Sequence, residues 1–333
     1  MALLWNKRSD TDRVFSEVTS TGKGPFWMAT RWRLIGSVLL LGLMWHVGAG
    51  DVFRVVLGVD PLSLASGALL TMGVLFLRSW RWRILCGGFG IKLSVGDAIR
   101  LYLLGTFVSS IAPGRVGDFA KAYYLRERHP EAGLAVGIAT VAYDRLLDLG
   151  QISALALGAI VVVPWVPEEI GPPVVFFGLT GFVISTAWRP VREGLMARPL
   201  NWALRRLPGE DDPLPPAPQT ANVLAAQALT LASLIGLVGM SVVLSRGLSI
   251  SIPAWRLAVL AALGALVSLI PVTTLGIGTR DSLYVSAASF LGASSTTMLG
   301  LSLLILSMYA LKSIIGWVTW ALSPVRDRQP PEL

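Results

Sequence analysis

The chain contains a series of apolar stretches, each near the length that crosses a lipid bilayer as a helix. Such a helix needs about 20 mostly apolar residues. Five stretches meet this length, the shorter ones with flanking residues: 34–48, 62–77, 173–188, 223–244 and 297–322. Tryptophans lie near many of their ends, as expected for rings that prefer the headgroup layer. The sequence therefore predicts an all-α, polytopic membrane protein.

The composition agrees with a membrane protein and argues against several function classes. Hydrophobic residues make up 53% of the 333 positions and charged residues only 14%, against about 25% in soluble domains. The net charge of +8 could indicate a nucleic-acid partner, but the basic residues lie in short clusters between apolar runs. The single cysteine, Cys86, and the distant His46 and His129 provide no metal-ligand spacing. We therefore expect no nucleic-acid partner, no metal and no cofactor.

Basic residues fix the expected orientation, because lysine and arginine favour the cytoplasmic side. They gather in 1–33, 78–92, 113–130, 189–206 and 326–328, whereas the loops 49–61, 164–172 and 245–256 hold only Arg54, Arg246 and Arg256. This bias predicts a multi-pass protein of the cell (plasma or inner) membrane with both termini in the cytoplasm. We divide the chain into a cytoplasmic segment 1–30, a transmembrane domain 31–323 and a cytoplasmic tail 324–333.

Three further apolar stretches are interrupted by polar or flexible residues: 95–112, 134–163 and 257–291. If 95–112 crossed fully, the basic residues after it would lie outside, so we expect a re-entrant hairpin that enters from the cytoplasm. The same reasoning makes the segment around Pro271 a hairpin that enters from outside. The prediction is about six full spans and two broken-helix hairpins.

This order is that of an inverted-topology repeat, with one half at about 31–167 and the other at about 172–323. The second half contains a proline-rich cytoplasmic linker, 189–219. Corresponding breaks in the two halves of a transporter point to its binding site. Pro113 and Pro271 are such a pair, although proline and glycine breaks can also arise without duplication.

The first break is SSIAPGRVGDFAK. Pro113 removes a backbone donor, and Gly114 and Gly117 permit angles that a helix does not use, so amide groups become free near Arg115. Free amides beside a guanidinium suit a phosphate. The alternative is a loop at the cytoplasmic surface, where Arg115 and Lys121 only touch lipid phosphates.

The second interrupted stretch carries Asp144, Arg145, Asp148 and Gln151. At 100° per residue these side chains form one polar stripe, which should face a cavity or another helix because charge at this depth is costly. The alternative is an internal ion pair that locks helices together. The stripe has one net negative charge and needs a partner such as Arg115, Arg280 or a substrate cation.

The third break contains GIGTRD, in which Gly276 and Gly278 loosen the chain before Arg280 and Asp281. A structural kink with a local Arg280–Asp281 pair is the alternative to a binding role. The basic and aromatic run at Arg78, Arg81 and Arg83 is expected to anchor a helix end to anionic lipid. Lys312 is expected to snorkel or to be paired.

These motifs resemble a flippase-like family named for the membrane region of lysylphosphatidylglycerol synthases. The resemblance covers about residues 31–322 and is carried by RSWRWRILCGGFGIKLSVGDAIR, APGRVGDFAKAYYL, YDRLLDL and IPVTTLGIGTRDSL, in that order. Ala112 stands where leucine is usual, and Asp144 and Asp281 stand where glutamate is common. We find no counterpart of the family's aminoacyl-transferring domain, so we expect the chain not to synthesise lysyl lipids by itself.

The resemblance implies roles for residues at all three breaks: Pro113, Gly114, Arg115, Gly117, Asp118, Asp144, Arg145, Gly276, Gly278, Arg280 and Asp281. Together with Asp148 from the polar stripe, these are the predicted substrate-binding residues. No residue is predicted to be catalytic.

The function expected from these features is a flippase-like transporter that moves a lipid with an anionic or modified headgroup between leaflets. The alternative is a membrane-embedded transferase, or an accessory subunit of one, in lipid, polyprenyl or hopanoid biosynthesis, with Asp144 or Asp148 as base. A scaffold for such a biosynthetic enzyme is a third reading. The expected partners are a membrane lipid and, in the last two readings, a lipid-biosynthesis enzyme.

Overall fold

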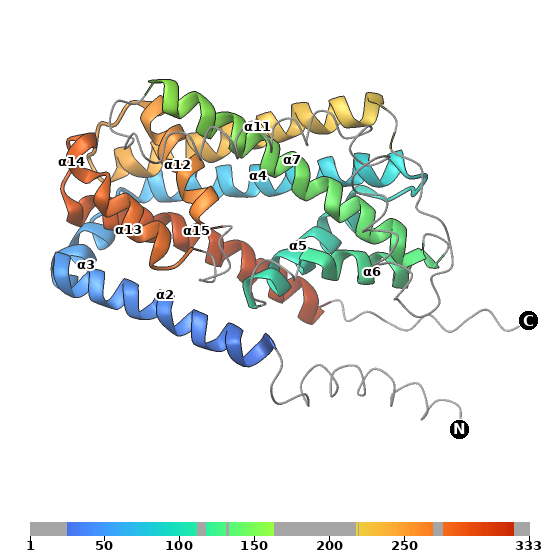
Figure 1. Ribbon diagram of the computed structural model, residues 1–333, viewed down its shortest axis with the longest axis horizontal. Helices are drawn as coiled ribbons and strands as arrows, with labels where there is room; N and C mark the ends of the chain where they lie inside the picture. Colours follow the sequence, from blue (N-terminus) through green and yellow to red (C-terminus); the bar gives the residue numbers. More distant parts are fainter. Residues whose placement is uncertain are drawn as a thin grey trace, which may run out of the picture.

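The computed structural model describes residues 25–111, 118–130, 133–162, 218, 220–268 and 276–322. Every regular element in these ranges is helical (Figure 1). The helices are α2 (Pro25–Val47), α3 (Ala49–Leu57), α4 (Pro61–Gly88), α5 (Val95–Ile111), α6 (Ala120–Arg128), α7 (Gly133–Val162), α11 (Thr220–Gly247), α12 (Ala254–Val267), α13 (Thr279–Ser286), α14 (Ala288–Leu291) and α15 (Ser295–Leu322). The all-α prediction is confirmed for this part of the chain.

A sharp bend separates α2 from α3. Gly48 has a φ of 96°, which a residue with a side chain rarely adopts, and the chain turns there by 91°. Val52 on α3 is buried, whereas Phe53 and Leu57 are exposed. The first predicted span is therefore a helix that ends in a short perpendicular arm.

Helix α4 begins at a complete N-terminal cap. The Asp60 carboxylate accepts hydrogen bonds from the backbone N–H and the hydroxyl of Ser63, both at 2.8 Å, and Pro61 occupies the first helical position. These hydrogen bonds from Ser63 hold the pKa of Asp60 below its ordinary value. The cap explains why the helix starts here and not within the preceding loop.

Helices α4 and α11 pack against each other as an antiparallel pair (Figure 1). Small residues bring the two backbones close: a Cβ at Gly67 would lie 2.9 Å from Leu244, and one at Gly236 would lie 2.7 Å from Val74. Close approach at small residues is the usual way in which membrane helices pack. The contact between α4 and α11 is the most extensive helix pairing among the described elements.

Many of the remaining contacts are between other helices, and some of them join helices that lie far apart in the sequence. Helix α5 packs on α15, α12 packs on α7, α6 packs on α7, and α13 packs on α15. Leucine and methionine side chains of α11, α12 and α15 form the largest apolar core, with Leu257, Met298 and Leu301 at most 1% exposed. The middle of α7 and parts of α5, α12 and α13 line one common region.

The outer surface is suited to lipid. Large apolar side chains such as Val38, Leu69, Leu231 and Ile314 are more than half exposed on α2, α4, α11 and α15. By length and composition, α4, α11 and α15 can each cross a membrane, and the bent α2–α3 pair makes a fourth candidate. Apolar exposure of this extent fits a membrane protein, because soluble monomers rarely carry such large patches.

Four of the five predicted plain spans coincide with helices α2, α4, α11 and α15. The fifth, 173–188, lies outside the described residues, so the predicted count of six spans stays a prediction. The stretch 134–163 forms one 30-residue helix, α7, despite its three charges. The other two interrupted stretches end their helices, α5 at Ile111 and α12 at Val267, next to the predicted breaks.

Candidate functional site

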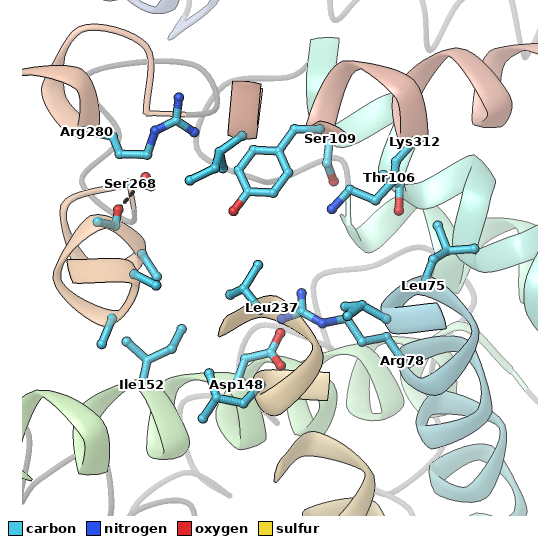
Figure 2. Close-up of a pocket in the computed structure, with 18 of the residues that line it drawn as sticks. Leu75, Arg78, Thr106, Ser109, Asp148, Ile152, Leu237, Ser268, Arg280 and Lys312 are labelled. Atoms are coloured by element: carbon cyan, nitrogen blue, oxygen red, sulfur yellow. Dashed lines mark hydrogen bonds between the residues drawn. The ribbon is translucent and has the colours of Figure 1, made fainter. Parts of the chain in front are cut away.

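A cavity of about 170 Å³ lies between the interrupted helices. Its charged lining residues are Arg78, Asp118, Arg145, Asp148, Arg280 and Lys312. The rest of the wall combines hydroxyl-bearing residues with apolar side chains, which include Val74, Leu75, Ile152, Leu234, Leu237, Ala261 and Ile305. Figure 2 shows Arg280 and Lys312 on one side of the cavity and Arg78 and Asp148 on the other. The cavity thus combines charged groups with an apolar wall.

One side of this site is an ion-pair cluster built around Arg81 on α4. Its Nε and Nη2 donate to Asp144 Oδ1 at 2.9 and 2.6 Å, and its Nη1 donates to Asp148 at 2.5 Å and to the Thr230 hydroxyl at 3.1 Å. Arg81 is 0% exposed. A guanidinium can satisfy two carboxylates from successive turns of a helix because its donors form a planar fork.

Lys121 on α6 supplies a second buried cation to the same cluster. Its Nζ lies 3.1 Å from Asp144 Oδ2, 4.4 Å from the centre of the Tyr102 ring and 5.4 Å from that of Trp82. The side chain is 1% exposed. It passes α5 at Gly105, where a Cβ would lie 2.4 Å from Lys121 Cγ. A carboxylate and two aromatic rings thus replace water around this ammonium group.

Arg145 belongs to the same ion-pair cluster and also lines the cavity. It pairs with Asp118 at 3.3 Å, with Asp144 at 2.6 Å and with Asp148 at 3.1 Å, and its side chain is 23% exposed. Three cations therefore face three carboxylates, and of these three cations Arg145 is the one that lines the cavity. Its Nε has no hydrogen-bond partner in the described part of the structure.

The other side of the site is organised by the backbone before α13. Gly276 and Gly278 have φ angles of 74° and 80°, and the Gly278 N–H donates to Asp281 Oδ2 at 2.8 Å. Asp281 Oδ1 accepts from the Ser302 hydroxyl at 2.6 Å and from Arg280 Nη2 at 3.1 Å. This left-handed turn needs glycine and fixes the carboxylate that holds Arg280.

The Arg280 guanidinium has described hydrogen-bond partners at Nε and Nη2 but not at Nη1. Its Nε donates to the Ser302 hydroxyl at 3.0 Å and its Nη2 to the Ser302 carbonyl at 3.2 Å. The residue is 3% exposed and lines the cavity. Its Nη1 finds no acceptor among the residues that the structure describes. A buried N–H of this kind is costly unless a ligand or water accepts from it.

The predicted substrate-binding residues fall into three groups. Asp118, Arg145, Asp148 and Arg280 line the cavity together. Four others are described but do not line it. Asp144 and Asp281 bind arginines, and Gly276 and Gly278 form the turn before α13. Those of the first break lie outside the described residues: Pro113, Gly114, Arg115 and Gly117. Substrate contact by any of the twelve stays a prediction.

The structure corrects one sequence-based expectation, one alternative reading and one suggested partner. Arg81 does not anchor a helix end to lipid, because it is fully buried against α7. Lys121 does not touch lipid phosphates at a surface, because it is buried against Asp144. The partners of the polar stripe are these two cations and not Arg280, which pairs with Asp281.

A signal for Arg81 was present in the sequence. Val74, Arg78, Arg81 and Leu85 are spaced by four, three and four residues, so they share one face of a helix. Val74 and Leu85 are apolar and buried, which places the two arginines on the inward face. A run of three arginines interleaved with tryptophans is also typical of a membrane interface. For this reason the run was interpreted as a lipid anchor, and the helical spacing that indicates burial was not used.

Comparison with known proteins bears on the same region of the chain. The family model described as the lysylphosphatidylglycerol synthase TM region matches residues 32–316. The chain belongs to this family. It is also 26% identical over 131 residues, which cover 39% of the chain, to the UPF0104 membrane protein of Methanothermobacter thermautotrophicus. That alignment covers 37% of the archaeal protein.

The lysylphosphatidylglycerol synthase TM region of this chain contains both arginine sites and the cavity between them. In the part of the chain that the structure describes, no three His, Cys, Asp or Glu side chains are arranged to hold a metal ion. The carboxylates there bind arginine and lysine instead. The arrangement can hold a small anionic group among guanidinium donors while apolar chains lie against the wall.

Proposed function

We propose that this membrane protein moves a lipid with an anionic or modified headgroup between the two leaflets. The observation that carries the proposal is the cavity itself, in which Arg145 and Arg280 present buried N–H groups beside an apolar wall. A lipid has the same two parts, a polar headgroup and apolar chains. A headgroup can cross about 30 Å of hydrocarbon only along a polar path, and in this proposal the charged groups of the interrupted helices provide it.

The charge balance favours an anionic headgroup. The described cations of the cavity and its wall are Arg78, Arg81, Lys121, Arg145, Arg280 and Lys312, and the carboxylates are Asp118, Asp144, Asp148 and Asp281. The cations exceed the carboxylates by two. An enclosed site of low dielectric with this excess attracts an anion more strongly than exposed charges do.

We further propose that the two sides of the cavity belong to two inverted halves. The crossed packing supports this: α5 of the first half packs on α15 of the second, and α12 of the second packs on α7 of the first. The antiparallel α4–α11 pair would then lie on the two-fold axis that relates the halves. A transporter built this way can open the same site to either side of the membrane.

The transport proposal is tested by reconstitution into liposomes with fluorescent phosphatidylglycerol, fluorescent diacylglycerol or a fluorescent zwitterionic lipid. A membrane-impermeant reductant then bleaches only the label in the outer leaflet. The wild-type protein should let the reductant bleach labelled phosphatidylglycerol beyond the outer-leaflet fraction, and Arg280→Gln should do so about tenfold more slowly or not at all. Arg100→Gln, a change at an exposed arginine of α5, serves as the matched control. Bleaching limited to the outer leaflet with every lipid would contradict a transport function.

The proposed orientation is tested by single-cysteine labelling in a Cys86→Ser background. Lys92 and Ser294 are exposed and lie outside the long helices. With cytoplasmic termini, a cysteine at position 92 should react from the cytoplasmic side and one at 294 from the opposite side. Reaction of both from one side would reject the inverted arrangement.

A further inference from the structure

Three arginines line the cavity, and they differ in how far their charge is already balanced. Arg145 pairs with three carboxylates, at 2.6, 3.1 and 3.3 Å. Arg280 pairs with Asp281 at 3.1 Å. Arg78 has no ion-pair partner and no hydrogen-bond acceptor among the described residues, although its Nε is buried. An anion in the cavity is therefore attracted most by Arg78, because the other two charges are already met by carboxylates.

Arg78 lies on the inward side of α4. Phe76 and Trp80 are each two residues away from it and are exposed. At 3.6 residues per turn, both rings point about 160° away from Arg78. Arg78 also lies ten residues before α4 ends at Gly88, which is about 15 Å along the helix axis. Its side chain cannot cover that distance, so it does not anchor this helix end to headgroups.

Asp148 attracts Arg78 electrostatically but is already bound by two other arginines. It pairs with Arg81 at 2.5 Å and with Arg145 at 3.1 Å. Figure 2 shows Arg78 and Asp148 on the same side of the cavity. Because two guanidinium groups hold this carboxylate, the charge of Arg78 stays largely available to a ligand.

The α5 wall of the cavity contains a hydroxyl group that is also unused. Ser109 lines the cavity, and its buried Oγ has no hydrogen-bond partner in the described part of the chain. Three other hydroxyl groups of the wall each donate to the carbonyl four residues before them: those of Thr106, Ser268 and Ser313. Buried polar groups in proteins nearly always have a partner. The unused donors of Arg78 and Ser109 therefore indicate that a ligand or water with acceptor atoms completes the cavity.

We infer that Arg78 is the residue that binds the anion of the ligand in this cavity, and that it takes one phosphate group. This inference rests on the proposed function, since it names the contact that the headgroup makes within the cavity. A guanidinium presents a planar set of donors to phosphate oxygens, and here no described residue uses them. The phosphate belongs to a lipid headgroup or to free phosphate, two sources with the same recognition chemistry.

This assignment predicts a stability that a structural arginine would not have. Removal of Arg81 leaves Asp144 and Asp148 without their main partner. Removal of Arg78 breaks no described ion pair or hydrogen bond. In detergent without added lipid, Arg78→Met should therefore melt at the temperature of wild type or above it. Added phosphatidylglycerol should raise the melting temperature of wild type more than that of Arg78→Met, because ligand binding stabilises the folded state.

Binding is measured on the purified full chain in detergent by native mass spectrometry, with phosphatidylglycerol and with diacylglycerol of the same acyl chains. Arg78→Met should retain phosphatidylglycerol about tenfold less well than wild type, since it loses hydrogen bonds to a charged group. Arg78→Lys keeps the charge but not the planar donors, so its binding should lie between the two. Diacylglycerol, which lacks phosphate, should bind equally to all three proteins.

Arg100→Met is the matched control, because it removes an exposed arginine of α5. It should bind phosphatidylglycerol as wild type does. Equal phosphatidylglycerol binding by wild type and folded Arg78→Met would overturn the inference. An Arg78→Met protein that fails to fold, or that melts as low as Arg81→Met, would overturn it too, because Arg78 would then be a structural partner of Asp148.

Inorganic phosphate distinguishes the source of the anion. A rise in the melting temperature of wild type with millimolar phosphate, absent in Arg78→Met, would support Arg78 as a site for free phosphate as well as for lipid. Loss of phosphatidylglycerol binding in Arg78→Met, without any effect of phosphate on wild type, would support Arg78 as a site for the headgroup alone.

The role of Arg78 and the transport function can fail separately. If Arg78→Met loses phosphatidylglycerol binding but the wild type moves no lipid in liposomes, the binding residue is kept and the transport proposal is lost. If the wild type moves phosphatidylglycerol and Arg78→Met binds and moves it equally well, transport is kept and the role of Arg78 is lost.

Discussion

The two arginine sites of this protein stabilise a buried guanidinium with different kinds of partner. Arg81 at the first site is held by carboxylates and a hydroxyl that come from α7 and α11. Arg280 at the second site is held by its sequence neighbour Asp281, by Ser302 and by a glycine turn. Charge inside an apolar bundle can thus be stabilised by partners distant in sequence or by a local backbone turn.

This difference predicts a structural role for the first site and a functional role for the second. The first cluster joins α4, α6, α7 and α11 and is balanced in charge, so loss of one member leaves another buried charge alone. At the second site Asp281 retains two donors even without Arg280. We therefore expect changes in the first cluster to act mainly on stability and changes at Arg280 mainly on function.

Replacement of Arg81 by methionine should have the largest effect. Asp144 and Asp148 would lose their main partner inside the bundle, and breaking a buried ion pair by removing one side costs about 3–5 kcal/mol. The melting temperature in detergent and the yield of monodisperse protein should both fall strongly. Arg100→Met, at an exposed position, should change neither.

A compensating change sharpens this prediction. In Arg81→Met with Asp148→Leu, a cation and a carboxylate are removed together, so the double variant should be more stable than the sum of the single effects predicts. Additive losses would mean that Arg81 acts through its packing and not through this ion pair.

The second site should instead depend on its backbone. In Gly278→Ala the new Cβ would lie 2.4 Å from the carbonyl oxygen of Gly36, in a residue with a φ of 80°. We expect a loss of about 2–3 kcal/mol in stability, since strain and overpacking add. Gly292→Ala is the matched control, because its φ is 68° but no atom lies within 4 Å. Similar melting temperatures for the two variants would show that the contact with α2 is unimportant.

Replacement of Arg280 should separate function from stability. A lysine keeps the charge but cannot hold Ser302 and Asp281 while it presents a further donor, so transport of phosphatidylglycerol should fall about tenfold. Alanine should lower transport further. Both variants should stay folded and melt well above Arg81→Met. Full transport by folded Arg280→Ala protein would remove Arg280 from the binding residues.

The smallest expected effect concerns the hydroxyl that Thr230 adds to the first cluster. Thr230→Val has nearly the same shape but loses the 3.1 Å hydrogen bond from Arg81 Nη1, which still binds Asp148. The loss of stability should be about 1 kcal/mol. Thr319→Val, whose hydroxyl donates to a carbonyl of its own helix, is the control. Equal melting curves for both would show that Thr230 does not support the cluster.

Much of the fold followed from the sequence because the bilayer restricts the choice. Apolar runs of bilayer length can only be helices, and proline and glycine end them. The helix ends at Ile111 and Val267 lie next to the predicted breaks for this reason. The 91° bend after α2 was missed, because Gly48 by itself does not specify the direction of a turn.

The site was predictable in part. The stripe of Asp144, Arg145 and Asp148 followed from helical spacing alone, and the structure places these residues on one inward face of α7. Their partners Arg81 and Lys121 did not follow, since each is a charged residue near an expected helix end and such residues usually face the headgroups.

Sequence patterns alone identify this chain as a helical membrane protein of the lysylphosphatidylglycerol synthase TM region family. They also show which of its segments carry charge into the apolar bundle. Length, hydropathy and helical spacing are properties of single segments, so they can be derived without the partners. The tertiary structure decided which cation meets which carboxylate and which donors remain in the cavity. Contacts such as Arg81 with Asp148, 67 residues apart, depend on how α4 and α7 pack, and no local pattern encodes that distance.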